Sequence, residues 1–208
     1  WKIDPLINRT FNQAIVIPAY AELEFLPLTI ESINQNKPEL LNQTLVVVVV
    51  NNANNSPQSI KDNNQLTIQK INENNYQFTL AVIDAASPGL ELPLKHAGVG
   101  LARKIGMDLA LPYLTSPQSL IFCTDADTQV SPDYLSKVKQ IFKSKNTSAA
   151  VIGFSHLKSQ DSAINDAIGQ YEKFLKTTAK KMQRAGSPYG YVSMGSTIVC
   201  TAEAYCAV

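Results

Sequence analysis

Short apolar runs alternate along this chain of 208 residues with segments whose apolar positions recur at helical spacing. A short apolar run indicates a strand buried on both faces of a sheet, whereas helical spacing indicates an amphipathic helix. The runs predict strands over residues 14–18, 44–50, 78–84, 120–124, 149–154 and 196–201. The spaced segments predict helices over residues 22–35, 56–73, 98–111, 131–145 and 161–184.

The order of these elements predicts an α/β fold with a mainly parallel mixed sheet flanked by helices. Strands that alternate with helices usually lie parallel, because each helix carries the chain back across the sheet in a right-handed crossover. A chain of this length suits one domain, which buries about 70% of the surface that the unfolded chain exposes.

Composition and charge exclude several classes of protein. The net charge is +1, and the basic residues are scattered along the chain, which predicts no nucleic-acid partner and no acidic-membrane footprint. No apolar run approaches the ~20 residues of a transmembrane helix.

Cys123 and Cys200 lie in apolar runs, which predicts reduced core residues in a cytoplasmic protein. The chain opens with Trp1 and stops at Val208 in mid-pattern, so we expect an excised piece of a longer protein.

Two carboxylates follow the apolar run 120–124 at once, with one residue between them. Ligands of open α/β sheets bind beyond the carboxyl ends of the strands, and in an extended chain Asp125 and Asp127 point the same way. A divalent cation such as Mg²⁺ or Mn²⁺ would relieve their repulsion and bridge to a phosphate. The alternative is a surface turn before the helix that Ser131 and Pro132 would start as N-cap and first residue.

Three further loops should meet the acid pair at this edge. After the first strand, Tyr20 offers a flat face for stacking, and Glu22 is a hydrogen-bond acceptor. After the second strand, the carboxamides of Asn51 and Asn52 match a pyrimidine edge such as uracil, although turn formation is the competing interpretation. Small residues open the helix after the third strand, and Arg103 lies one turn inside it, facing either a ligand or solvent.

Four segments in this order resemble the inverting, Asp-x-Asp type family 2 glycosyltransferases of the GT-A fold. They are Ile-Pro-Ala-Tyr-Ala-Glu at 17–22, Val-Val-Val-Asn-Asn-Ala-Asn-Asn-Ser at 48–56, Gly-Val-Gly-Leu-Ala-Arg-Lys-Ile-Gly at 98–106 and Thr-Asp-Ala-Asp at 124–127. Segments 194–196 and 202–205 resemble the acceptor-side strand of that family and the turn after it. The resemblance runs from about residue 14 to the end of the chain. It implies one GT-A domain with a Rossmann-like nucleotide-sugar-binding half over 1–130 and an acceptor half over 131–208, which we expect to be truncated.

The resemblance also implies roles for individual residues. Asp125 and Asp127 would be catalytic: Asp125 would contact the ribose or donor sugar, and Asp127 would hold Mn²⁺ or Mg²⁺ on the diphosphate. The family usually has two aspartates where Asn51 and Asn52 stand, and this departure favours uracil over guanine. The implied nucleotide-binding residues are Pro18, Ala19, Tyr20, Glu22, Asn51, Asn52, Arg103, Asp125 and Ala126.

The implied activity is metal-dependent transfer of a sugar, with inversion, from a nucleotide-sugar donor to the hydroxyl of a saccharide, lipid-linked or other acceptor. A UDP-sugar is the favoured donor. We expect the general base beyond Val208 and favour neither Glu203 nor Glu172 for it. A non-catalytic nucleotide-binding module remains open. A sugar nucleotidyltransferase is less favoured, because residues 19–22 contain no glycine or lysine.

Overall fold

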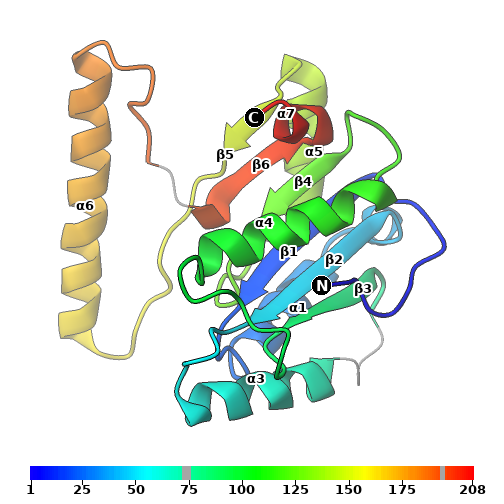
Figure 1. The fold of residues 1–208 in the computed structure, drawn as a ribbon. Helices are drawn as coiled ribbons and strands as arrows, with labels where there is room; N and C mark the ends of the chain where they lie inside the picture. The colour runs from blue at the N-terminus through cyan, green and yellow to red at the C-terminus, as the bar shows by residue number, and fades with distance from the viewer. Residues whose placement is uncertain (72–75, 193–194) are drawn as a thin grey trace.

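The computed structural model describes residues 1–71, 76–192 and 195–208, and a six-stranded sheet forms its centre (Figure 1). The helices and strands are, in chain order, β1 (Gln13–Ala19), α1 (Leu26–Asn34), α2 (Pro38–Leu41), β2 (Thr44–Asn51), α3 (Gln58–Ile71), β3 (Thr79–Ala85), α4 (Val99–Ala110), the 3₁₀ turn η1 (Leu111–Tyr113), β4 (Leu120–Cys123), α5 (Tyr134–Lys145), β5 (Ala149–Val151), α6 (Ser162–Arg184), the 3₁₀ turn η2 (Gly195–Thr197), β6 (Ile198–Thr201) and α7 (Ala202–Cys206).

The strands lie in the order β3-β2-β1-β4-β6-β5. The first four strands in this order are parallel to one another. Strand β6 is antiparallel to both β4 and β5. The predicted α/β fold with a mainly parallel mixed sheet is therefore confirmed. Because β1, β2 and β4 lie side by side and run the same way, the loops that follow them meet at one edge of the sheet.

Helices cover both faces of the sheet, which explains why its central strands are apolar between their end residues. Every residue of β2 is buried. On one face, α4 packs against β1 and β2, and its Gly106 leaves no room for a side chain: a Cβ atom there would lie 2.4 Å from Cγ1 of Val16. On the other face, apolar side chains of α1, α3 and α5 complete a second core layer.

The boundaries of several predicted elements are wrong. The helix expected over 22–35 begins at Leu26, and α2 was not predicted. The helix expected from Ser131 is α5, which begins at Tyr134. The Ser131 hydroxyl does not cap α5 but donates to Oδ1 of Asp133 at 2.7 Å. Pro132 lies in the turn before the helix. The strand expected over 149–154 ends at Val151, where its pairing with β6 ends.

The C-terminal elements also differ from the prediction. The strand expected over 196–201 opens as η2 and becomes extended only at Ile198, and the turn expected after it is the short helix α7. The expected end of α3 near residue 73 and the proposed acceptor-side residue 194 lie outside the described residues.

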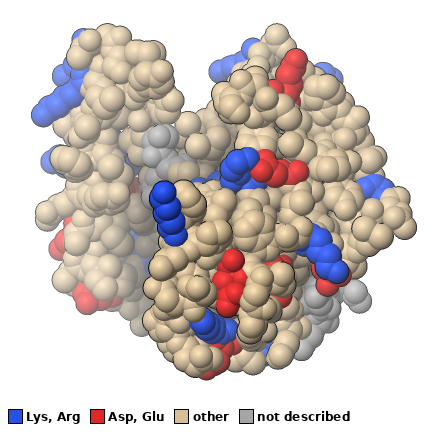
Figure 2. All heavy atoms as spheres, viewed as in Figure 1, with Lys and Arg blue, Asp and Glu red and all other residues tan. Residues whose placement is uncertain are grey.

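Helix α6 lies beside the rest of the molecule, and in Figure 2 it forms a lobe of its own. Within the described residues, none of the helices offers an apolar stretch of the length that a membrane span requires. Cys123 and Cys200 are buried free thiols, as predicted, and burial raises the pKa of the Cys123 thiol to about 12.

Candidate active site

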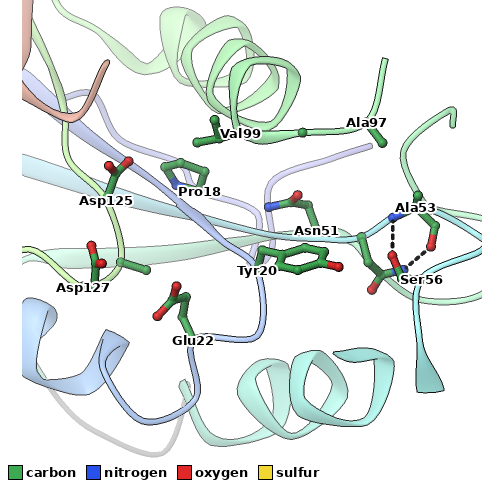
Figure 3. Close-up of a pocket in the computed structure, with 13 residues that line it drawn as sticks. Pro18, Tyr20, Glu22, Asn51, Ala53, Ser56, Ala97, Val99, Asp125 and Asp127 are labelled. Atoms are coloured by element: carbon green, nitrogen blue, oxygen red, sulfur yellow. Dashed lines mark hydrogen bonds between the residues drawn. The ribbon is translucent and has the colours of Figure 1, made fainter. Parts of the chain in front are cut away.

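A cavity of about 530 Å³ opens at the sheet edge where β1, β2 and β4 end and α4 begins (Figure 3). Loops from three parallel strands and the start of one helix form its wall, as expected for a ligand site of an open α/β sheet. Its lining residues are Pro18, Tyr20, Glu22, Asn51, Asn52, Ala53, Ser56, Ala97, Gly98, Val99, Asp125, Ala126 and Asp127.

The structure brings most of the predicted site residues together here. Pro18, Tyr20, Glu22, Asn51, Asn52, Asp125, Ala126 and Asp127 all line the cavity. Two predicted residues do not: Ala19 is fully buried in β1, and Arg103 borders a second cavity, which α4 and the C-terminal Tyr205, Cys206 and Val208 line. Ala19 and Arg103 are therefore outside the lining of the first cavity, although Arg103 pairs with Asp125, which lines it.

Three carboxylates gather at one end of the cavity. Asp125 and Asp127 lie in the loop after β4 with their carboxylates toward the same side, and Glu22 approaches from the loop after β1 (Figure 3). Burial, together with the negative charges of Asp127 and Asp125, raises the pKa of Glu22 above its ordinary value. A cation placed among these groups would reverse that effect, since it would stabilise the ionised carboxylates.

The protein neutralises only one of the two aspartates. Nη2 of Arg103 lies 2.8 Å from Oδ1 of Asp125, and the guanidinium also packs against Gly195, where a Cβ atom would lie 2.6 Å from Nη1. Asp127 has no ion pair with any residue in the described part of the chain. Asp125 is therefore held in place by Arg103, while the carboxylate of Asp127 remains available to a cation.

The donor set fits a hard divalent cation that takes part of its coordination from a ligand. Across residues 1–71, 76–192 and 195–208, no three His, Cys, Asp or Glu side chains are arranged to hold a metal by themselves. Mg²⁺ and Mn²⁺ are commonly bound through one or two carboxylates, with the remaining positions filled by substrate phosphates and water. Asp127 and its neighbours fit that pattern and not a closed structural metal site.

The two asparagines after β2 are buried and differ in what they leave free. Nδ2 of Asn51 donates to the carbonyls of Ala19 at 2.9 Å and Val49 at 3.2 Å, and its Oδ1 has no partner among the described residues. Asn52 donates to Ala53, and its Oδ1 accepts from Asn64 at 2.8 Å. Asn51 therefore keeps an acceptor for a ligand, whereas both ends of the Asn52 amide are used within the protein.

Asn64 was not predicted to belong to the site, and it supports the cavity wall without lining the cavity. It lies on α3, is fully buried, donates to the carbonyl of Asn51 and accepts from the N–H of Ala21 at 2.9 Å. Ala21 has a φ of 58°, a left-handed conformation that is rare outside glycine. Asn64 thus ties the loop bearing Tyr20 to the end of β2. A polar residue on the sheet-facing side of a predicted helix was the only signal of this role.

Tyr20 and Ser56 complete the end of the cavity opposite the acids (Figure 3). The Tyr20 side chain is 46% exposed, so a ring face is open to a planar ligand. Ser56 accepts from the N–H of Ala53 at 3.1 Å and closes a turn, which places the exposed Asn54 and Asn55 in that turn and outside the cavity lining. The cavity therefore has a planar, uncharged end and an acidic end.

No family model and no curated protein matches this sequence. Solved structures with a similar fold include S. aureus TarS residues 1–349, with 14% identity over 74% of this chain and 39% of that chain, at a TM-score of 0.45. A mannosyltransferase from Pyrobaculum calidifontis in complex with GDP-Man and Mn²⁺ is 13% identical over 93% of this chain and 45% of that chain, at a TM-score of 0.47. Glucosyl-3-phosphoglycerate synthase from Mycobacterium tuberculosis in complex with UDP is 16% identical over 94% of this chain and 58% of that chain, at a TM-score of 0.43. The chain thus spans less than two thirds of each of these proteins.

Proposed function

We propose that this chain carries the donor site of a metal-dependent, inverting glycosyltransferase of the GT-A type, related to family 2, that uses a UDP-sugar. The observation that supports this most is the shared cavity: Asp125 and Asp127 line the same cavity as Tyr20, although more than a hundred residues separate them from it in the chain. A cation, a diphosphate and a planar base require such a cavity with one acidic end and one flat, uncharged end.

The base would lie at the uncharged end. Tyr20 would stack on it, and Oδ1 of Asn51 would accept the N3–H of uracil. Guanine presents two donors on the corresponding edge, which an anionic carboxylate accepts better than a single amide oxygen does. The fixed orientation of the Asn51 amide, set by its bonds to Ala19 and Val49, therefore supports a uridine nucleotide.

The diphosphate and sugar would lie at the acidic end. Asp127 would hold Mn²⁺ or Mg²⁺, and Asp125, kept in place by Arg103, would contact the ribose or the donor sugar. When bound, the ion would act as a Lewis acid that stabilises charge on the leaving diphosphate. The residues of the chain would bind the donor, orient its anomeric carbon and keep the base fixed. The transferred group would be a hexose.

The acceptor hydroxyl needs a base to take its proton, and two acids outside the cavity do not serve. Glu203 accepts from Gln118 at 2.7 Å, and Glu172 is engaged with His156 at 3.0 Å. Among the described acidic residues, those lining the cavity are Glu22 and the two aspartates, all on the donor side. Because no acid on an acceptor side of the cavity is found among the described residues, a second candidate function is a nucleotide-binding module that does not transfer the sugar.

The metal role of Asp127 is tested by calorimetric titration of UDP and GDP, each with and without Mn²⁺. We expect UDP to bind more tightly than GDP, Mn²⁺ to strengthen UDP binding, and Asp127→Asn to abolish the effect of Mn²⁺. The matched control is Asp133→Asn, because Asp133 pairs with Lys137 outside the cavity and should leave UDP binding unchanged.

Two results separate the possible outcomes. Indifference to both nucleotide and metal would contradict the donor site. Metal-dependent UDP binding without release of UDP from any UDP-sugar, with a range of hydroxyl acceptors present, would favour the non-catalytic module over the enzyme.

A further inference from the structure

Helix α6 is long and mostly uncovered. It spans Ser162–Arg184, and Ala179 is its one buried residue. Figure 1 shows it beside the sheet and not against it. An amphipathic helix normally buries its apolar stripe against the rest of its domain, so the uncovered part of this stripe needs an explanation.

Four large apolar side chains form a row along α6, and one of them, Tyr171, also meets the rest of the molecule, since its ring lies 5.9 Å from that of His156. Ile164, Tyr171, Phe174 and Met182 follow one another at intervals of about two turns, one turn and two turns, which places them on one side of a helix. Their exposed fractions are 48%, 48%, 66% and 40%. Single exposed apolar side chains are common on protein surfaces, but several of them along one side of a helix indicate an interaction surface.

The edge of the helix that meets the rest of the molecule lies beside this row. Oε1 of Glu172 accepts from the backbone N–H of His156 and lies 3.0 Å from its Nδ1. Leu175 and Lys176 border a small cavity with Phe154 on the same edge. The helix is attached along this edge, which Tyr171 borders, and Ile164, Phe174 and Met182 of the row remain accessible.

The charge of α6 differs from that of the remaining chain. The helix has five basic and two acidic side chains, hence a net charge of +3, whereas the whole chain has +1. The basic residues begin at Lys173, in the middle of the helix, and continue to its C-terminal end, and within the described residues only Lys176 of the five has an ion pair. Favourable interaction with the helix dipole accounts for basic residues in the last turn alone, here Lys181 and Arg184.

We propose that α6 binds an anionic lipid surface, lying in the plane of the interface with the exposed apolar row inserted among the acyl chains. A helix with an aromatic and aliphatic side and a lysine-rich polar side is the type that binds at membrane interfaces. Of its basic side chains, Lys181 borders the apolar row and the others lie on the polar side of the helix, from which their long side chains can extend toward the negatively charged headgroups. The proposal does not depend on the donor site or on its ligand.

Charge favours this occupant over a second copy of the chain. A two-fold symmetric dimer uses the same patch on both partners, so two α6 helices, each with a charge of +3, would repel one another. The near-zero charge of the whole chain conceals this local excess, since the rest of the chain has a net charge of −2.

The test is co-sedimentation of the full chain with vesicles of phosphatidylcholine alone or mixed with phosphatidylglycerol. We expect binding to the mixed vesicles only, and binding that weakens as salt is added. Phe174→Gln should weaken binding about tenfold through lost apolar burial. Replacing Lys180 and Lys181 together by Gln should weaken it about 25-fold, at about fivefold for each lysine.

Matched controls come from outside α6. Leu6→Gln removes an apolar side chain that is 79% exposed, and replacing Lys143 and Lys145 by Gln removes two exposed lysines near the C-terminal end of α5; neither change should alter vesicle binding. Absence of binding to the mixed vesicles, or equal losses in the control variants, would overturn the proposal. So would a concentration-dependent dimer in sedimentation velocity that Phe174→Gln abolishes.

Discussion

Asn51 shows how one side chain combines a structural and a binding role. Its amide N–H₂ group donates to the carbonyls of Ala19 and Val49, which joins the ends of β1 and β2, and its oxygen is left for a ligand. A carboxylate has the same shape but no donor, so an aspartate here would direct negative charge at two carbonyl oxygens. An asparagine at position 51 therefore satisfies both carbonyls, which an ionised aspartate there could not do.

We predict that Asn51→Asp lowers the free energy of unfolding by about 1–3 kcal/mol at pH 7, because two buried acceptors lose their donor. The site disfavours the ionised form, so the pKa of the new carboxyl would be raised in the folded state above its unfolded value of about 3.9. The destabilisation should therefore shrink as pH falls toward 4, where the protonated carboxyl can donate. Urea unfolding at several pH values measures both effects.

The control for this prediction is Asn54→Asp, since Asn54 is exposed in the turn after β2. Its stability should change little at any pH. A stable Asn51→Asp variant with no dependence on pH would contradict the hydrogen-bonded role of the Asn51 amide.

At the scale of elements, α4 depends on a glycine that the helical pattern does not explain. A Cβ atom at Gly106 would lie 2.4 Å from Val16 Cγ1 and 2.9 Å from Val49 Cγ2, so the helix backbone lies directly on two central strands. We predict that Gly106→Ala lowers the free energy of unfolding by about 1–3 kcal/mol through overpacking. Chemical denaturation gives the value.

Gly100 provides the matched comparison within the same helix. A Cβ atom there would meet nothing within 4 Å, so Gly100→Ala should stabilise the protein by roughly 0.5–1 kcal/mol through helix propensity. If both variants changed stability in the same direction and by the same amount, close packing of α4 on the sheet would not be the reason for the glycine at 106.

The elements also show where local patterns stop being informative. The apolar run of β2 predicted a strand at 44–50, and the observed strand, Thr44–Asn51, extends it by one residue. Helix starts were less predictable, because a start depends on which hydrogen bonds the preceding residues make. Ser131 has the identity of an N-cap, yet its hydroxyl donates to Asp133, and α5 begins three residues later.

At the scale of the whole molecule, a ligand that binds only the folded chain should raise its melting temperature. With Mn²⁺ present and UDP at 100 times its dissociation constant, the stabilisation is about 2.7 kcal/mol. For a chain of this size, this corresponds to a rise of roughly 5–11 °C in Tm. Differential scanning calorimetry with UDP, GDP and buffer checks the prediction, and UDP should give the largest rise.

The same experiment has a control in the site itself. Asp127→Asn should melt at nearly the wild-type temperature in buffer, because Asp127 has no ion pair among the described residues. It should lose the part of the rise that depends on Mn²⁺. An undiminished rise in this variant would mean that the cation binds elsewhere.

The sequence by itself determined the α/β architecture and the position of the acid pair. An apolar run must be buried whatever its neighbours are, and a polar residue that directly follows such a strand must lie at the edge of the sheet. Only the tertiary structure decided which side chains of the site interact. Arg103 forms an ion pair with Asp125 and does not line the cavity, and Asn64 donates a hydrogen bond to Asn52. Strand order and helix packing bring these distant side chains together, and a local pattern of apolar and polar residues contains no information about that order.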